Sequence, residues 1–315
     1  MPKRQLGGSG LEIAPLVFGG NIFGWTVDES TAFSLLDAFV AGGFNCIDTA
    51  DVYSNFVPGN QGGESEATIG RWLRARGKRD DVVLATKVGN SMGGDRKGLS
   101  KRYITEAVED SLLRLQTDYI DLYQAHRDDP NTPFETTLEA FDALIKSGKV
   151  RAIGASNYTG VRLGEALRVS TQKGLPRFQT LQPLYNLYDR ANYEADLEAV
   201  CISGALGVMP YFSLASGFLT GKYRSKQDLQ KSKRGAFIES KLNERGLRIL
   251  AALDEVCAEL QSTPTRVALA WLLARPSITA PIASATSLSQ LEELIAATRL
   301  QLSAAAIEQL NRASA

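Results

Sequence analysis

Hydrophobic residues along the chain alternate between two spacings, one typical of helices and one typical of short buried strands. Residues 28–43 show the helical spacing: apolar side chains recur every three or four positions, Asp28 stands where a cap is expected, and Gly42 and Gly43 end the pattern. The apolar run 44–50 follows directly and is typical of a buried strand. The pattern therefore predicts a helix followed by a strand.

The same pairing recurs along most of the chain. Further helices are expected at 63–77, 100–115, 132–148, 158–174 and 192–204, and strands at 81–87, 118–124, 149–157, 177–183 and 206–212. After a polar stretch from about 222 to 241, the pattern predicts helices at 243–261, 264–274, 287–296 and 303–312 and a strand at 277–283. In the helix at 132–148, Thr132 is the expected cap and Pro133 the first helical residue.

The early apolar run 16–20 brings the number of predicted strands to eight, each associated with helices. This count predicts an α/β protein with a (β/α)8 TIM barrel, formed as one domain by residues 1–315, with extra helices near the C-terminus. Residues 4–13 predict a short hairpin in front of the barrel, placed to close its bottom. An open doubly wound sheet is the alternative, but no GxGxxG follows any predicted strand.

Composition limits the kind of partner. Lys and Arg equal Asp and Glu at 35 each, so no net positive field favours nucleic acid. The three cysteines lie far apart without a CxxC pair, which argues against a zinc site or a disulfide framework and favours a reducing compartment. No signal-peptide segment is recognised, and no apolar run approaches the roughly 18 residues of a membrane helix. We expect a cytoplasmic, soluble protein with a small-molecule partner.

In a TIM barrel, the active face lies at the C-terminal ends of the strands. The polar residues expected there are Asn21, Asp48, Thr49, Tyr53, Lys87, His126, Ser156, Asn157, Gln182, Tyr211, Ser213, Ser284 and Thr286. Taken singly, each is more often a solvated or packed residue than a catalyst, including His126, the only histidine in the chain. The topology, however, predicts that an acid, a phenol, an amine and an imidazole meet at one mouth.

Such a set can transfer a proton to a carbonyl oxygen. The ordinary pKa of a phenol is about 10, and we expect Lys87 to lower the pKa of Tyr53 by stabilising the phenolate. Asp48 ends an apolar run and needs a partner, which Lys87 is placed to supply. A neutral His126 can donate a hydrogen bond to the substrate oxygen. No metal site is expected, because one histidine and no clustered thiols leave only oxygen ligands.

Six segments carry a family resemblance: GFNCIDTADVY at 43–53, ATK at 85–87, DLYQAHRDD at 121–129, GASN at 154–157, LQPLYNL at 181–187 and YFSLASGFLTGKY at 211–223. In this order and spacing, over almost the whole chain, they resemble the aldo-keto reductases. The later segments are similar to the bacterial branch related to potassium-channel β subunits. The resemblance implies an NADP-dependent enzyme of the alcohol dehydrogenase type that reduces an aldehyde or ketone to an alcohol. It implies Tyr53 as general acid, tuned by Lys87 and Asp48, with His126 orienting the carbonyl.

The resemblance also implies the cofactor contacts. Ser156, Asn157 and Gln182 match residues that hold the carboxamide of the nicotinamide, and Tyr211 matches the ring stacked on it. The expected contacts along the pyrophosphate are Ser213, Leu214, Ser216, Gly217 and Leu219, and Phe212 is a further expected cofactor contact. The family binds its cofactor extended over the barrel mouth, which accounts for the missing Rossmann glycines. The run 217–222 can be interpreted instead as a phosphate loop, but it is one residue too short for GxxxxGK[ST].

The sequence departs from the family where relatives that prefer NADPH hold the adenosine 2′-phosphate. No Lys or Arg occurs between Arg275 and Arg299, where Ser284, Thr286 and Gln290 are the expected contacts instead. Hydroxyl groups bring no charge, and charge-assisted hydrogen bonds are roughly twice as strong as neutral ones. Lys222 and Arg234 are therefore the candidate compensating cations. NADP(H) is expected first, with NAD(H) as the alternative.

At the adenine end, Glu293 matches an acidic position that contacts adenine in relatives, while Leu294 replaces the usual Asn. A different function is the alternative, because relatives that keep all four residues matched by Asp48, Tyr53, Lys87 and His126 can serve as nucleotide-sensing regulatory subunits that turn over slowly. No long extension precedes the predicted hairpin, as an inactivating segment requires. Net isomerisation or dehydration with retained cofactor is a third interpretation. The oligomeric state and the substrate are not indicated by the sequence.

Overall fold

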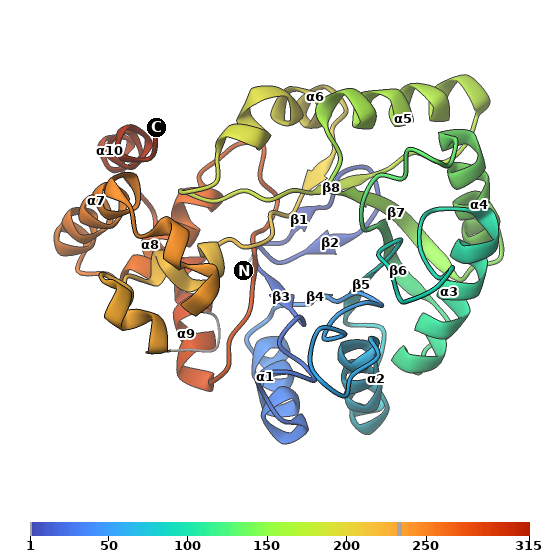
Figure 1. Cartoon of the computed structure of the whole chain (residues 1–315), viewed down its shortest axis with the longest axis horizontal. Helices are drawn as coiled ribbons and strands as arrows, with labels where there is room; N and C mark the ends of the chain where they lie inside the picture. Colours follow the sequence, from blue (N-terminus) through green and yellow to red (C-terminus); the bar gives the residue numbers. More distant parts are fainter. Residues whose placement is uncertain (1, 232–234) are drawn as a thin grey trace.

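The computed structural model describes residues 2–231 and 235–315. Its central sheet has eight parallel strands in the order β10-β3-β4-β5-β6-β7-β8-β9 (Figure 1). Their bounds are β3 (Val17–Gly19), β4 (Cys46–Asp48), β5 (Val83–Val88), β6 (Ile120–Ala125), β7 (Val150–Ser156), β8 (Thr180–Gln182), β9 (Gly207–Val208) and β10 (Ile282–Ala283). The two edges are joined by backbone hydrogen bonds from Thr279 N to Val208 O, 2.9 Å, and from Ile282 N to Pro210 O, 2.9 Å. The strands therefore close into the predicted TIM barrel.

Helices surround the strands on the outside (Figure 1). They are α1 (Glu29–Ala41), α2 (Glu64–Arg76), α3 (Lys101–Leu115), α4 (Phe134–Lys146), α5 (Gly160–Lys173), α6 (Glu198–Ser203), α7 (Glu244–Leu260), α8 (Pro264–Leu273), α9 (Leu288–Ala297) and α10 (Ala304–Ser314). The helical spacing of α1 buries Leu35, Leu36 and Phe39 against the barrel, and Asp28 accepts a hydrogen bond from Thr31 N as its predicted cap. None of the helices in the described residues is both long and apolar enough to cross a membrane.

Two local predictions are wrong. Thr132 does not cap α4, and Pro133 is the N-cap rather than the first helical residue, because the Thr132 hydroxyl donates instead to Asp129 Oδ2 at 2.8 Å. The same carboxyl oxygen accepts from Leu99 N. The helix predicted at 192–204 is not uniform, since Tyr193–Leu197 forms a π-helical turn before α6 begins. The segment between β9 and α7 contains 3-10 turns at Ala215–Thr220, Lys226–Lys231, Gly235–Phe237 and Glu239–Lys241.

The N-terminal hairpin closes the bottom of the barrel, as predicted. Strands β1 (Arg4–Gln5) and β2 (Glu12–Ile13) pair antiparallel and lie across the centre of the ring of strands (Figure 1). The hairpin's Leu6, Leu11 and Ile13 are buried against inward-facing side chains of the barrel. Gly7 has a φ of +58°, and a Cβ there would lie 2.1 Å from Gln179 O, so this close approach requires glycine. The opposite end of the barrel is left free for a site.

Candidate active site

Lys87, the fifth residue of β5, lies at the centre of the group predicted at the mouth. Its side chain is fully buried, and Nζ donates to Asp48 Oδ2 at 2.7 Å, to Thr49 O at 2.7 Å and to Tyr53 OH at 2.9 Å. These three bonds use all three ammonium donors. The predicted ion pair between Asp48 and Lys87 is therefore present, and it fixes the amine against the phenol.

Asp48, the last residue of β4, is held from its other side by two amides. Its Oδ1 accepts from Gln182 Nε2 at 2.8 Å and from Gln124 Nε2 at 3.4 Å. Gln124 was not among the sequence candidates, although a signal existed: it precedes His126 by two residues in a strand, and a period of two places both on the same face. The carboxylate is thus oriented by neighbouring strands of the barrel.

His126 follows β6 and lies half-buried at the mouth, with its ring 6.0 Å from that of Tyr53 at an interplanar angle of 78°. Its backbone O accepts from Asn157 Nδ2 at 2.8 Å. Burial, and then the charges of Lys87 and Arg127, lower the pKa of His126 well below its ordinary value. The imidazole is therefore neutral at physiological pH.

The expected direction of the Tyr53 pKa shift is wrong. Burial, followed by the negative charge of Asp48 and its hydrogen bond with the phenol, raises the pKa of Tyr53 well above its ordinary value. Lys87 approaches the phenol closely, but its charge is balanced by Asp48 at 2.7 Å, so desolvation dominates. Burial also lowers the pKa of Lys87, although the charge of Asp48 opposes this. In this arrangement Tyr53 is a neutral phenol that keeps its proton.

The residues expected to hold a nicotinamide lie on the same rim. Ser156 and Gln182 end β7 and β8 and are bonded to each other, Ser156 Oγ donating to Gln182 O at 2.8 Å. Asn157 is exposed, and its Oδ1 accepts from Tyr211 OH at 2.8 Å. The structure thus brings Ser156, Asn157, Gln182 and Tyr211 together beside Asp48 and His126.

The segment after Tyr211 has an unusual backbone. Phe212, Ala215 and Ser216 all have a φ between +49° and +61°, and Gly217 has a φ of +100°. Positive φ in residues other than glycine costs energy and is found preferentially at functional sites. Phe212 is exposed, Leu214, Ser216 and Gly217 are partly exposed, and Ser213 is buried with its hydroxyl bonded to Pro210 O. The side chain of Leu219 is fully buried in the core, so only the backbone of this residue can face a ligand.

The residues expected at the adenosine end are spread over two regions. Lys222 is exposed on the segment after β9, while Arg234 lies outside the described residues. Ser284 Oγ lies 2.7 Å from both Gly19 O and Asn21 Oδ1, at the end of β10. Gln290 Oε1 accepts from Thr286 N at 2.9 Å and from Thr286 Oγ1 at 3.1 Å, so these two side chains form one unit at the start of α9.

Glu293 is not free at its expected position. It forms an ion pair with Arg266 and accepts a hydrogen bond from Thr263 Oγ1 at 2.6 Å. Arg266 was not among the candidate cations, because it lies outside both the aligned segment and the 222–234 stretch, and α8 carries it to α9 from 27 positions earlier in the chain. A cation therefore lies near the predicted adenosine end.

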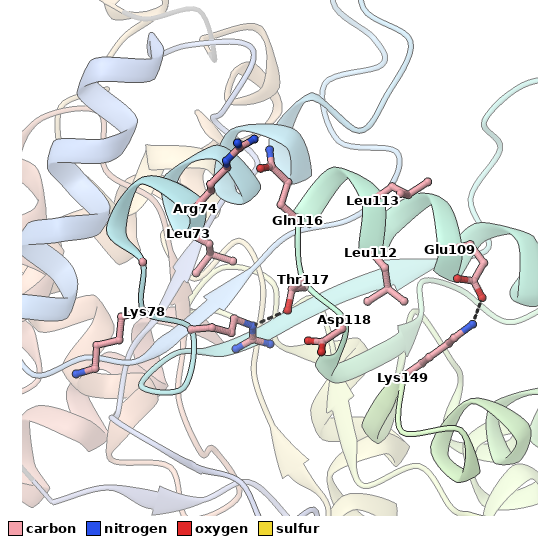
Figure 2. A pocket seen from close by; sticks show the side chains of 12 residues that line it. Leu73, Arg74, Lys78, Glu109, Leu112, Leu113, Gln116, Thr117, Asp118 and Lys149 are labelled. Atoms are coloured by element: carbon pink, nitrogen blue, oxygen red, sulfur yellow. Dashed lines mark hydrogen bonds and ion pairs between the residues drawn. The ribbon is translucent and has the colours of Figure 1, made fainter.

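A separate groove of about 920 Å³ lies at the opposite end of the barrel wall (Figure 2). It is formed by the C-terminal turns of α2 and α3 and the loops that enter β5 and β6, and its lining includes Leu73, Arg74, Leu113 and Asp118. Asp48, Tyr53, Lys87 and His126 are not among its lining residues. The groove therefore lies at the N-terminal end of the strands, where the residues of a TIM barrel serve stability rather than catalysis. Among the described residues, no group of three or more His, Cys, Asp or Glu side chains is arranged to hold a metal.

A closed parallel barrel with an acid, an amine, a phenol and an imidazole at the C-terminal ends of its strands defines a TIM-barrel enzyme. A sequence model of the Aldo/keto reductase family matches residues 15–315, and the chain belongs to this family of oxidoreductases. It is 37% identical to an uncharacterized oxidoreductase of Bacillus subtilis, YrpG, over 99% of this chain and 95% of that protein.

Two other relatives carry different names. The chain is 33% identical to a probable voltage-gated potassium channel subunit beta of Oryza sativa, over 93% of this chain and 90% of that protein. It is 31% identical to the Protein tas of Escherichia coli, over 96% of this chain and 94% of that protein. The predicted family, and the similarity of this chain to channel β subunits, are thereby confirmed.

Proposed function

We propose that the protein reduces an aldehyde or ketone to an alcohol, with NADP(H) as hydride donor and Tyr53 as proton donor. The observation that carries this proposal is the placement of Lys87 Nζ between Asp48 Oδ2, 2.7 Å, and Tyr53 OH, 2.9 Å, at the open end of the barrel. A neutral phenol can give its proton to a carbonyl oxygen that gains negative charge. The adjacent ammonium group then stabilises the phenolate that remains.

His126 supplies the second contact to the carbonyl oxygen. Its Nδ1 is buried and has no hydrogen-bond partner among the described residues. A buried unpaired N–H is less tolerated than an unpaired acceptor, which favours the tautomer with the proton on Nε2. That tautomer gives the ring a donor at Nε2 with which to polarise and orient the substrate carbonyl.

The residues at the rim fit a nicotinamide ring. Gln182 donates through Nε2 to Asp48, and no bond to its Oε1 occurs within the described part of the chain, so this oxygen can accept from a carboxamide N–H. Asn157 is exposed, and Tyr211 is held by it with a partly exposed aromatic ring. The bound nicotinamide supplies the hydride; the protein orients the ring, excludes water and delivers the proton.

NADP(H) is our first choice of cofactor, with NAD(H) second. Lys222 is exposed on the segment after β9, where a phosphate can reach it, while Thr286 and Gln290 can contribute hydroxyl and amide contacts. Glu293, held by Arg266, is the proposed contact for adenine. Ser284, with its hydroxyl already bonded, serves to fix the loop after β10.

A regulatory nucleotide-binding subunit is the alternative function, favoured by the 33% identity to a probable channel β subunit. Oxidation of NADPH and of NADH should be followed over a panel of aldehydes, sugars and ketones. Carbonyl-dependent oxidation with stoichiometric alcohol supports the reductase. Tight cofactor binding without turnover over the whole panel favours the regulatory role, and product formation without net cofactor oxidation indicates isomerisation or dehydration.

A further inference from the structure

Asp51 is a buried acid on the segment that joins Asp48 to Tyr53, and the proposed reaction does not use it. It is 1% exposed. Its two carboxyl oxygens have no hydrogen-bond partner in the described part of the structure. An ionised carboxylate is strongly disfavoured in such a place unless another group balances its charge. Its surroundings therefore decide its protonation state.

These surroundings lie on the outer side of the barrel wall, between the strands and helices α2 and α3. Glu66 of α2 accepts from Thr86 Oγ1 at 2.5 Å and forms an ion pair with Arg114 of α3 at 2.7 Å. The buried hydroxyl groups of Tyr103 and Tyr123 lie close enough to be affected by the charge of Asp51, and neither has a hydrogen-bond partner in the described part of the structure. The ionisable groups that interact with Asp51 in this region are therefore the acid Glu66, two phenols and the cation Arg114, which is already paired.

The charges around Asp51 balance without it. Two cations lie nearby, Lys87 fully buried and Arg114 partly buried, and each has its own acid: Lys87 with Asp48 at 2.7 Å, and Arg114 with Glu66 at 2.7 Å. An ionised Asp51 would be a third negative charge against two positive ones. Burial and then the charge of Glu66 raise the pKa of Asp51 well above its ordinary value, and Arg114, the Val52 N–H and Lys87 oppose this only in part.

We propose that Asp51 is a positioning residue for Tyr53 and Lys87: as a neutral carboxylic acid it fills the space behind the 49–53 segment and keeps that segment against β5. Its own N–H donates to Lys87 O at 3.3 Å, and Thr49 N donates to Ala85 O at 2.8 Å. If Asp51 were ionised, its charge would raise the pKa of both Tyr53 and Lys87, and Tyr53 would give up its proton less readily.

The protonation state can be tested on the full chain without any assay of activity. The unfolded carboxyl ionises above about pH 3.9, whereas the folded one keeps its proton to a higher pH, so the wild type loses stability as the pH rises between the two values. Asp51→Asn does not titrate. We expect its Tm to equal that of the wild type near pH 4 and to exceed it by a margin that grows with pH until the folded carboxyl ionises and stays constant above that pH. A lower Tm at pH 8 overturns the proposal.

Asp121→Asn is the matched control. Asp121 is also 1% exposed, but it is paired with Arg79 at 2.6 Å and with Arg151 at 2.7 Å. The same substitution there removes the acceptor of two ion pairs, so the Tm of Asp121→Asn at pH 8 should fall below that of the wild type. A higher Tm for Asp51→Asn and a lower Tm for Asp121→Asn at pH 8 distinguish an unpaired neutral acid from a paired carboxylate.

The positioning role rests on the proposed function and needs a kinetic measurement. Asp51→Asn keeps the shape of the neutral acid and should restore the activity lost in Asp51→Ala, whose kcat we expect to fall by about 10- to 100-fold through misplacement of Tyr53, with cofactor affinity unchanged. Equal losses in both variants, or wild-type kcat in Asp51→Ala, overturn the positioning role. Absence of turnover in the wild type with every carbonyl instead overturns the proposed function, while the Tm series still decides the state of Asp51.

Discussion

Lys87 Nζ lies 2.7 Å from Asp48 Oδ2, and this ion pair is buried on both sides, with side-chain exposures of 0% and 2%. The same ammonium group donates to Tyr53 OH at 2.9 Å. The pair therefore has two separate effects: it satisfies two charges in the barrel interior, and it places a cation at the oxygen proposed to give up a proton. These effects can be measured independently.

Removing only the cation should destabilise the fold. Lys87→Met leaves Asp48 charged and buried, so we expect the free energy of unfolding to fall by about 3–5 kcal/mol. Asp48→Asn combined with Lys87→Met should cost less than Lys87→Met alone, because no charge is then left uncompensated. Urea unfolding of the two single variants and the double variant gives the coupling energy. An additive cycle would show that the two side chains act independently.

Tyr53→Phe should lower kcat by about 10² to 10⁴ with cofactor affinity retained, because the ring stays in place and only the proton donor is lost. The measurement is steady-state turnover with the best carbonyl from the screen, together with a fluorescence titration of the cofactor. Tyr119→Phe is the control, since its hydroxyl contacts Asp80 on the surface, away from the mouth. Turnover of Tyr53→Phe equal to that of Tyr119→Phe excludes Tyr53 as the proton donor.

The barrel was predictable because its signals are local. Each helix has an apolar face with a recurring spacing, and each strand is a short apolar run, so the order of elements fixes which residues share the mouth. The proximity of Asp48 and Lys87 followed from that order and from the need of a buried acid for a partner. Gln124 was predictable by the same strand periodicity that places His126 inward.

The properties that sequence patterns missed depend on packing between distant segments. The pKa of Tyr53 rises because the phenol is desolvated next to Asp48, and the degree of burial is set by all surrounding strands. Arg266 pairs with Glu293 where α8 contacts α9, and no local sequence pattern predicts this ion pair. The unpaired state of Asp51 likewise appears only when the partners of Glu66 and Lys87 are known.

His126 offers a clean test, because the chain has one histidine. Its imidazole NMR signals should stay those of the neutral ring well below pH 6.5, the ordinary pKa of histidine. Since the unfolded histidine binds a proton below pH 6.5 and the folded one does not, this residue should reduce stability progressively as the pH falls from 6.5 towards the folded pKa. His126→Gln should remove that part of the pH dependence. Titration of the folded imidazole near pH 6.5 would contradict the proposed role.

Cofactor preference should depend on Lys222. A charge-assisted hydrogen bond contributes about 1.5–3 kcal/mol, so Lys222→Met should raise the KM for NADPH by about 10- to 100-fold if the ammonium group holds the 2′-phosphate. The KM for NADH should then change little. Lys226→Met is the matched control, because Lys226 lies on the same segment, is 80% exposed and pairs with Glu239 at 3.3 Å. Equal losses with NADPH and NADH would instead place Lys222 at the pyrophosphate, which both cofactors share. A preference for the 2′-phosphate would then have to come from another cation, and Arg266 on α8 is the next residue to substitute.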